Sequence, residues 1–142
     1  MTRYVLTEFL LPNLRDYNKL ILELNMLHHH EKLDYVEFPS RNLEGTKQFF
    51  TQAFGWSFED YGADYTSFAD QGLNGGFFKS DSSATTESGS ALLVFYSKDL
   101  EGTLNKVTSM GGKIVRPIFS FPGGRRFHFT EPGGNEFGVW SD

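Results

Sequence analysis

The stretch Asn42-Leu43-Glu44-Gly45-Thr46 returns 57 residues later as Asp99-Leu100-Glu101-Gly102-Thr103. Each copy begins with a residue type that favours the N-terminus of a helix, and each follows a short apolar run typical of a strand. The order of predicted elements around the two copies is also the same. We therefore expect a duplicated unit in which one strand, one helix and three further strands follow each other.

The predicted elements divide the chain into two such modules. The first module, 33–79, is expected to hold a helix and four strands: strand 33–39, helix 43–54 ending at Gly55, and strands 56–59, 65–68 and 75–79. The second, 91–142, repeats the order: strand 91–96, helix 100–110, and strands 113–117, 126–130 and 136–140. Residues 80–90 are rich in Ser, Thr and Gly, and we interpret them as a mobile linker.

Residues 1–32 differ from both modules and form a predicted helical extension. Apolar residues recur there at helical spacing behind Asn13, a suitable cap: Leu14, Tyr17, Ile21, Leu24 and Leu27. Such an apolar stripe is expected to dock on the domain formed by 33–142 or on a second copy of the chain.

Composition excludes several classes of function. The chain has 142 residues, no cysteine and a net charge of -5, so disulfides, thiolate nucleophiles and cysteine metal sites are absent. No basic stripe suits nucleic acid, and the apolar runs are too short to span a membrane. The N-terminus lacks the pattern of a signal peptide, so we expect a cytoplasmic protein.

Three stretches resemble one known family. Residues 42–56, with a Phe49-Phe50 pair and a Phe-Gly-Trp sequence at the end, are similar to the first helix of this family. Residues 111–115 are similar to the end of the family's second helix, and residues 131–137 to the turn before its last strand. In this order, over 33–142, the chain resembles the vicinal oxygen chelate superfamily of glyoxalase I, extradiol dioxygenases and the bleomycin and fosfomycin resistance proteins. The resemblance implies an α+β fold in which two βαβββ modules curl their mixed sheets around a cleft.

The resemblance also implies where a metal ion would be held. Metal-dependent members place one ligand on the first and one on the last strand of each module, and the corresponding positions here are Tyr35, Phe77, Leu92 and Gly138. Three of these side chains have no donor atom, and a neutral tyrosine is a poor ligand for divalent ions. We therefore expect that the metal site is lost, that no cofactor is bound and that the family's Lewis-acid chemistry does not carry over.

Two ionisable residues are candidates for chemistry without a metal. Glu37 shares a strand face with Tyr35, which the resemblance turns toward the cleft; it either pairs with Arg125 or Arg126, or contacts a dimer partner, or acts as a ligand anchor or general base. His128 is either a hydrogen-bonded structural residue or an acid and base near neutral pH.

The residues expected to face the cleft define a candidate ligand site. Glu37, His128 and Glu136 are an alternative metal set if they converge. The ligand-binding residues we predict are Tyr35, Phe77, Leu92, Val94, Tyr96, Arg126, Glu136 and Trp140.

Three functions are consistent with this pattern. The first is metal-independent binding of a small, partly apolar molecule in the cleft between the modules. The second is a lyase or isomerase that uses Glu37 as base and His128 as acid, which requires both in one pocket. The third is a dimeric interaction module whose N-terminal helix fills the cleft and leaves no open pocket. A homodimer is expected in any case, and the sequence does not decide whether the protein is an enzyme.

Overall fold

The computed structural model of the protein describes residues 13–25 and 27–142, and the chain divides into two compact units, Met1–Asp34 and Tyr35–Asp142. The first unit contains helix α1, Leu14–Asn25, and the side chain of Asn13 accepts a 3.0 Å hydrogen bond from the Asp16 N–H, as expected for a cap. The other predictions for 1–12 and for Met26 lie outside the described residues. No helix among the described residues is long and apolar enough to cross a membrane.

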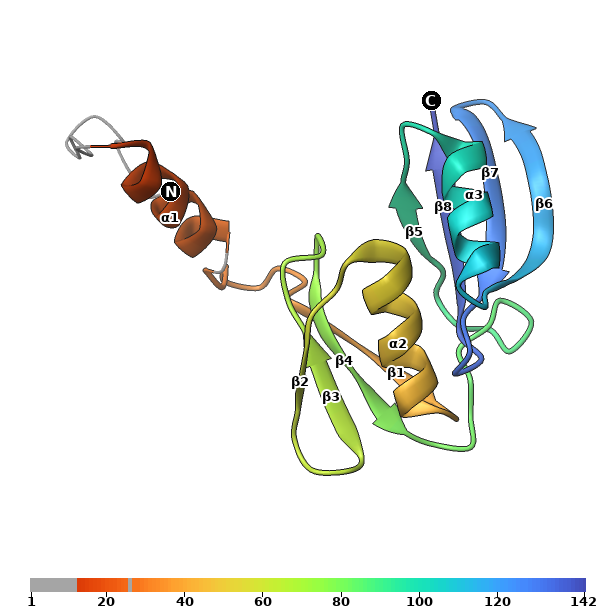
Figure 1. Cartoon of the computed structure of the whole chain (residues 1–142), viewed down its shortest axis with the longest axis horizontal. Helices are drawn as coiled ribbons and strands as arrows, with labels where there is room; N and C mark the ends of the chain where they lie inside the picture. Colours follow the sequence, from red (N-terminus) through yellow and green to blue (C-terminus); the bar gives the residue numbers. More distant parts are fainter. Residues whose placement is uncertain (1–12, 26) are drawn as a thin grey trace. The chain divides into compact units, whose positions relative to one another are not determined.

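The first module of the second unit is a four-stranded sheet covered by one helix (Figure 1). Its elements are β1 Tyr35–Ser40, α2 Leu43–Phe54, β2 Phe58–Asp60, β3 Tyr65–Phe68 and β4 Asn74–Lys79. The strand order is β1-β4-β3-β2, with β1 parallel to β4 and the other pairs antiparallel.

The second module has the same topology. Its elements are β5 Leu93–Tyr96, α3 Leu100–Ser109, β6 Lys113–Phe121, β7 Gly124–Thr130 and β8 Glu136–Ser141, in the order β5-β8-β7-β6. The expected α+β fold of two βαβββ modules is therefore confirmed. The predictions for the last three strands were too short, by two residues at the start of β7, by one at the end of β8 and by four at the end of β6. The edge strand β6 continues to Phe121 because it passes Pro117 through a register irregularity between Arg116 and Phe119.

The repeated stretch performs the same local task in both modules. The Asn42 side chain accepts a 2.9 Å hydrogen bond from Gly45 N–H, and the Asp99 side chain accepts a 3.0 Å bond from Gly102 N–H. A Cβ atom at either glycine would collide with the capping side chain, which explains why the repeat carries glycine there. Both helices therefore begin where the sequence predicts.

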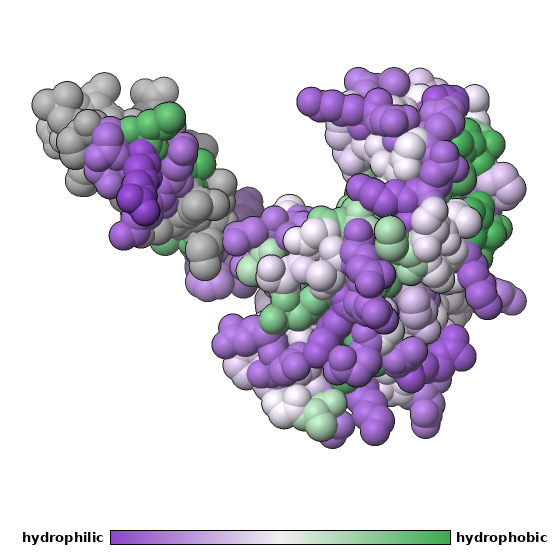
Figure 2. Space-filling model, in the orientation of Figure 1, coloured by the Kyte–Doolittle hydropathy of each residue, from purple (hydrophilic) through white to green (hydrophobic). Residues whose placement is uncertain are grey.

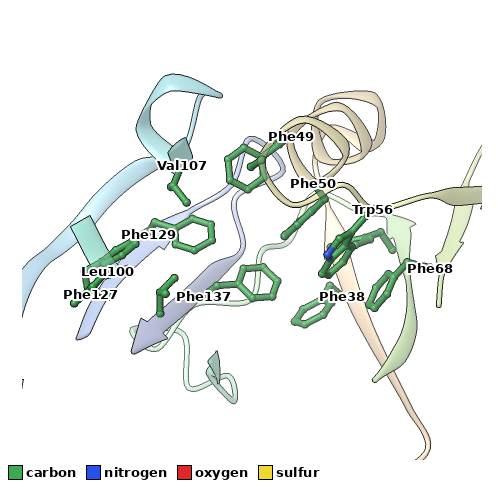
Figure 3. Close-up of a cluster of buried hydrophobic side chains, with 13 residues drawn as sticks. Phe38, Phe49, Phe50, Trp56, Phe68, Leu100, Val107, Phe127, Phe129 and Phe137 are labelled. Carbon is green, nitrogen blue, oxygen red and sulfur yellow. The ribbon is translucent and has the colours of Figure 1, made fainter. Parts of the chain in front are cut away.

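Aromatic rings from both modules share one core (Figure 3). The fully buried ring of Phe137 in β8 lies 5.1 Å from Phe38 in β1 and 5.3 Å from Phe50 in α2, so the second sheet is packed against the first module. Burial of these phenylalanines thus joins the two sheets into one domain.

The surface of this unit seen in Figure 2 is mostly hydrophilic, with smaller apolar patches.

A buried carboxylate also joins the modules. Glu131, in the turn before β8, accepts a 2.7 Å hydrogen bond from Thr46 Oγ1 in α2. The same turn contributes Asn135, whose Nδ2 donates to the Pro39 carbonyl at 2.6 Å. Burial raises the pKa of Glu131, against the opposing effect of hydrogen bonds from Gly133, Thr46 and Asn135.

The segment 80–90 differs from the free linker that its composition predicts. It contains no helix or strand, but Ala84 N–H donates to Asn135 Oδ1 at 2.8 Å and Ala84 O accepts from Glu136 N–H at 2.8 Å. Thr86 N–H donates to a Glu136 carboxylate oxygen at 3.0 Å. The segment is docked on the second sheet because its polar backbone finds partners there.

Candidate ligand-binding site

One face of the second sheet carries most of the predicted site. Strand pairing places His128 opposite Gly138 and Arg126 opposite Trp140, while Val94 pairs with Gly138 from the other side. Side chains two apart on a strand share a face, so these five residues lie together. We call this surface, with Tyr96, the open face.

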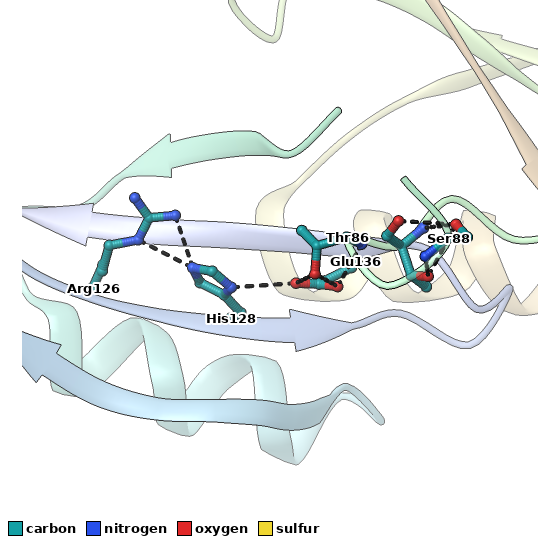
Figure 4. Close-up of polar contacts among 6 residues, drawn as sticks. Thr86, Ser88, Arg126, His128 and Glu136 are labelled. Carbon is teal, nitrogen blue, oxygen red and sulfur yellow. Dashed lines mark hydrogen bonds and ion pairs between the residues drawn. The ribbon is translucent and has the colours of Figure 1, made fainter. Parts of the chain in front are cut away.

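A chain of hydrogen bonds runs along the open face (Figure 4). The Nε and Nη2 groups of Arg126 lie 3.1 and 2.8 Å from His128 Nε2. Because a guanidinium only donates, Nε2 must accept, and the ring proton is on Nδ1. His128 Nδ1 lies 3.2 Å from Glu136 Oε2, and Glu136 accepts further bonds from Thr86. Both ring nitrogens of His128 are therefore occupied.

Burial and the neighbouring arginine favour the neutral form of the imidazole. Burial lowers the pKa of His128, and the positive charge of Arg126 lowers it further, against the opposing effect of Glu136. Burial alone would raise the pKa of Glu136, but hydrogen bonds from Thr86 and His128 outweigh it and hold that pKa below its usual value. A neutral His128 is a fixed acceptor that orients Arg126.

Aromatic rings and a second arginine complete the surroundings of Arg126. Its guanidinium carbon lies 5.7 Å from the ring centres of both Phe119 and Phe121, and that of Arg116 lies 3.7 Å from Phe119. Neither arginine forms an ion pair among the described residues. Arg125 points to the opposite face and pairs with Glu101, so neither Arg125 nor Arg126 pairs with Glu37.

Two pockets meet at the open face. The smaller, about 410 Å³, is lined by Val94, Phe121, Gly123, Arg126, Trp140 and Asp142. The larger, about 630 Å³, lies where the modules adjoin and is lined mainly by aliphatic and aromatic side chains of both modules. We call the larger one the junction pocket. Val94 lines both pockets, so they are neighbours across one side chain.

Glu37 belongs to a different cluster, on the first sheet. Tyr65 OH donates a 3.0 Å hydrogen bond to Glu37 Oε1, and the Tyr35 hydroxyl lies 2.5 Å from that of Tyr65. Because the single proton of Tyr65 is used on Glu37, Tyr35 donates to Tyr65. Burial, then these two neighbours, raise the pKa of the Tyr65 phenol well above its usual range. No hydrogen bond joins Glu37 to His128, and neither lines the two pockets.

The structure brings together part of the predicted ligand site. Leu92, Val94 and Tyr96 line the junction pocket, and Arg126 and Trp140 line the smaller one with Val94. Tyr35 lies instead on the first sheet with Glu37, and Glu136 is buried behind His128.

The assignment of Phe77 to the open side of the sheet was wrong by one residue. Phe77 is fully buried, 5.6 Å from Phe50, whereas β1–β4 pairing puts Gly76 opposite Glu37. Glu37 and Val94 are equivalent in the repeat, and Val94 pairs with Gly138. Gly76 is therefore the structural counterpart of Gly138.

Sequence reasoning missed three contributors to the site. Phe119 and Phe121 were outside the predicted strands, although their alternation with Ser120 before the Pro-Gly-Gly turn is a strand signal. Thr86 was placed in a linker, and no local signal indicates that it meets Glu136.

Comparison with known proteins identifies the family. A family model described as the Glyoxalase/Bleomycin resistance protein/Dioxygenase superfamily matches residues 32–139. The chain belongs to this superfamily. No curated protein matches the sequence. The fold that the glyoxalase superfamily shares is also seen in solved structures of low sequence identity.

Three of these structures show the range of relatives. A fosfomycin resistance protein from Listeria monocytogenes, solved with manganese(II) and a dihydroxypropylphosphonic acid, has a TM-score of 0.65 at 16% identity over 79% of this chain and 90% of its own. A lactoylglutathione lyase from Agrobacterium tumefaciens has a TM-score of 0.60 at 13% identity, over 80% of this chain and 95% of its own. A glyoxalase-related enzyme from Fulvimarina pelagi has a TM-score of 0.62 at 15% identity, over 79% of this chain and 88% of its own.

The residues present do not fit the metal of the glyoxalase superfamily. With the corrected register, the four positions at which the resemblance places metal ligands hold Tyr35, Gly76, Leu92 and Gly138, of which only the phenol has a donor atom. The alternative set is not assembled, because His128 contacts Glu136 while Glu37 sits with Tyr65. In the part of the chain that the structure describes, no three His, Asp or Glu side chains converge.

Proposed function

We propose that this glyoxalase-superfamily protein binds a small, partly apolar molecule in the junction pocket without a metal ion. The observation that supports this most directly is the pocket itself: about 630 Å³, between the modules and lined mainly by apolar side chains. Its volume is within the range of small-molecule sites, and its composition is typical of them. The four ligand positions without a usable donor set support the metal-independent part of the proposal.

Acid–base catalysis by Glu37 and His128 has less support. That function requires both side chains in one pocket, whereas they lie on different sheets. His128 uses both ring nitrogens within the protein, so it has no free position from which to move a substrate proton.

A homodimer is part of the proposal. Several aromatic side chains on or beside the first sheet are exposed, including Tyr35, Tyr61 and Phe78. Exposed apolar surface of this kind is typical of contact with another protein. Light scattering after size exclusion should give twice the chain mass, and Tyr61→Ser should shift the population toward monomer.

Binding of a neutral arene tests the function directly. Naphthalene-1-carboxamide is the probe, and isothermal titration calorimetry in EDTA is the measurement. We expect saturable binding that survives EDTA and is lost in Leu92→Trp, because the larger side chain fills the junction pocket. Leu33→Trp, the same substitution at a highly exposed leucine, is the control and should bind normally.

Two results would contradict the proposal. One is an absence of binding to the native wild-type protein. The other is binding that persists in Leu92→Trp or disappears in EDTA, since the ligand would then use another surface or a metal ion. Far-ultraviolet circular dichroism of both variants confirms that each retains the fold.

A further inference from the structure

We propose that the ligand is an amphiphilic anion, whose apolar body occupies the junction pocket and whose carboxylate, or similar oxyanion, binds Arg126. This inference rests on the proposed function and names the chemical class of its ligand. Four features of the open face carry it: the donors left on Arg126, the room above Gly138, the state of the nearby carboxylates and the shared wall of the two pockets.

Arg126 has donors in reserve and no anionic partner. A guanidinium has five N–H groups, and only Nε and Nη2 point to an acceptor, the Nε2 atom of His128. No hydrogen bond of Nη1 and no ion pair of Arg126 are found among the described residues. The side chain is only partly exposed, and because His128 is itself held by Glu136, the guanidinium is oriented before a ligand arrives.

Gly138 leaves the space that Arg126 needs. A Cβ atom at this position would lie 3.3 Å from Val94 and 3.6 Å from Arg126 Nη2. A longer side chain on the same strand would extend into the region between Val94 and the guanidinium. The glycine that removes a metal ligand therefore opens the surface beside a cation.

The carboxylates near the open face already have donors. Asp142, which lines the smaller pocket, accepts a 2.7 Å hydrogen bond from Tyr96 OH. Glu136 is held by Thr86 and His128, and neither carboxylate forms an ion pair with Arg126. A second cation, Arg116, lies on the same side over Phe119. An incoming oxyanion thus finds the unused donors of Arg126 in a setting where charged hydrogen bonds are strong.

The arrangement of the two pockets indicates that the ligand also has an apolar part. Val94 separates the junction pocket from the pocket that contains Arg126 and Trp140. A molecule with an apolar ring in the first and a carboxylate at the second would contact both. Its flat body would lie beside Tyr96 in the junction pocket, and its carboxylate end would lie near Trp140, whose ring is 5.2 Å from that of Tyr96.

A matched pair of probes tests the charge. Naphthalene-1-carboxylate and naphthalene-1-carboxamide have nearly the same shape and differ in charge, and both are titrated calorimetrically into the full chain. We expect the carboxylate to bind about 10- to 100-fold more tightly, the usual effect of a charge-assisted hydrogen bond. Arg126→Gln should remove this preference and keep carboxamide binding.

Arg125→Gln is the control, because it removes the same charge from the neighbouring residue on the opposite face. It should leave the preference unchanged. Asp142→Asn should strengthen carboxylate binding, since it removes a negative charge from the pocket wall. Equal binding of the two probes to wild type, or equal losses in Arg125→Gln and Arg126→Gln, would overturn the inference.

The outcomes separate this inference from the proposed function. Carboxamide binding that is blocked by Leu92→Trp, with no preference for carboxylate, leaves the function standing and removes the inference. If carboxylate binding requires Arg126 but is unchanged in Leu92→Trp, the anion site at Arg126 is supported. The junction pocket is then not where the ligand binds, and the proposed function is contradicted. If neither probe binds, both proposals fall.

Discussion

Thr46 donates a 2.7 Å hydrogen bond from its hydroxyl to the buried carboxylate of Glu131, and so links the first helix of one module to the last turn of the other. The hydroxyl also contacts Ser40 at 2.8 Å. The repeat offers a comparison, because Thr103 makes the equivalent 2.7 Å contact with Ser97. No hydrogen bond to a carboxylate is found for Thr103 within the described residues.

Replacing Thr46 should therefore cost more than replacing its counterpart. Thr46→Val leaves Glu131 buried with one donor fewer, so we expect a loss of about 1–3 kcal/mol in the free energy of unfolding. Thr103→Val should cost about 1 kcal/mol or less, because that hydroxyl is only partly buried. Urea denaturation followed by circular dichroism measures both. Equal losses would show that the carboxylate contact adds nothing to stability.

The two equivalent glycines should respond differently to alanine. A Cβ at Gly76 would collide with the ring of Tyr65, whereas at Gly138 the nearest atom lies at 3.3 Å, on Val94. We expect Gly76→Ala to destabilise the fold by about 1–3 kcal/mol, as overpacking does, and Gly138→Ala to change stability by less than about 1 kcal/mol. Thermal unfolding of the pair provides the measurement, and the reverse ranking would be inconsistent with the register described above.

His128 should make stability depend on pH. Its pKa is lowered in the folded state, so below the ordinary value of about 6.5 the unfolded chain takes up a proton that the folded chain does not. This contribution to stability is complete above pH 6.5 and is lost as the pH falls toward the lowered value.

His128→Gln isolates the effect, since glutamine does not titrate while Glu131 and the other histidines stay unchanged. The stability difference between wild type and this variant should shift against wild type between pH 7 and pH 5, by no more than about 1.4 kcal/mol per pH unit. Urea unfolding at several pH values follows it. A difference that is constant with pH would mean that His128 is not held neutral.

The two tryptophans should report on different environments. Trp56 is 4% exposed and stacks 4.4 Å from Phe50, whereas Trp140 is partly exposed beside Arg126. Acrylamide should therefore quench Trp56→Phe, which retains Trp140, more strongly than Trp140→Phe. Addition of naphthalene-1-carboxylate should protect Trp140 if the ligand lies beside it. Stronger quenching of Trp140→Phe would contradict this placement of the two rings.

Local contacts explain why parts of the structure could be predicted from the sequence. Asn42 and Asp99 each bind an N–H three residues ahead, so the repeat predicts both helix starts without knowledge of the rest of the chain. The alternation of Arg126 and His128 on one strand likewise placed them on one face. The four metal-ligand positions came from resemblance, and strand pairing moves one of them from Phe77 to Gly76.

The remaining features of the site depend on contacts between residues that are distant in the sequence. Gly76 rather than Phe77 lies on the Glu37 side of the sheet because pairing with β1 sets the register, and a shift of one residue turns every side chain over. Phe119 reaches Arg126 past an irregularity in β6, and Thr86 reaches Glu136 across 50 residues of chain. These contacts depend on surfaces that exist only after the sheets have formed, so a pattern read along the chain determined the modules but not the partners of Arg126.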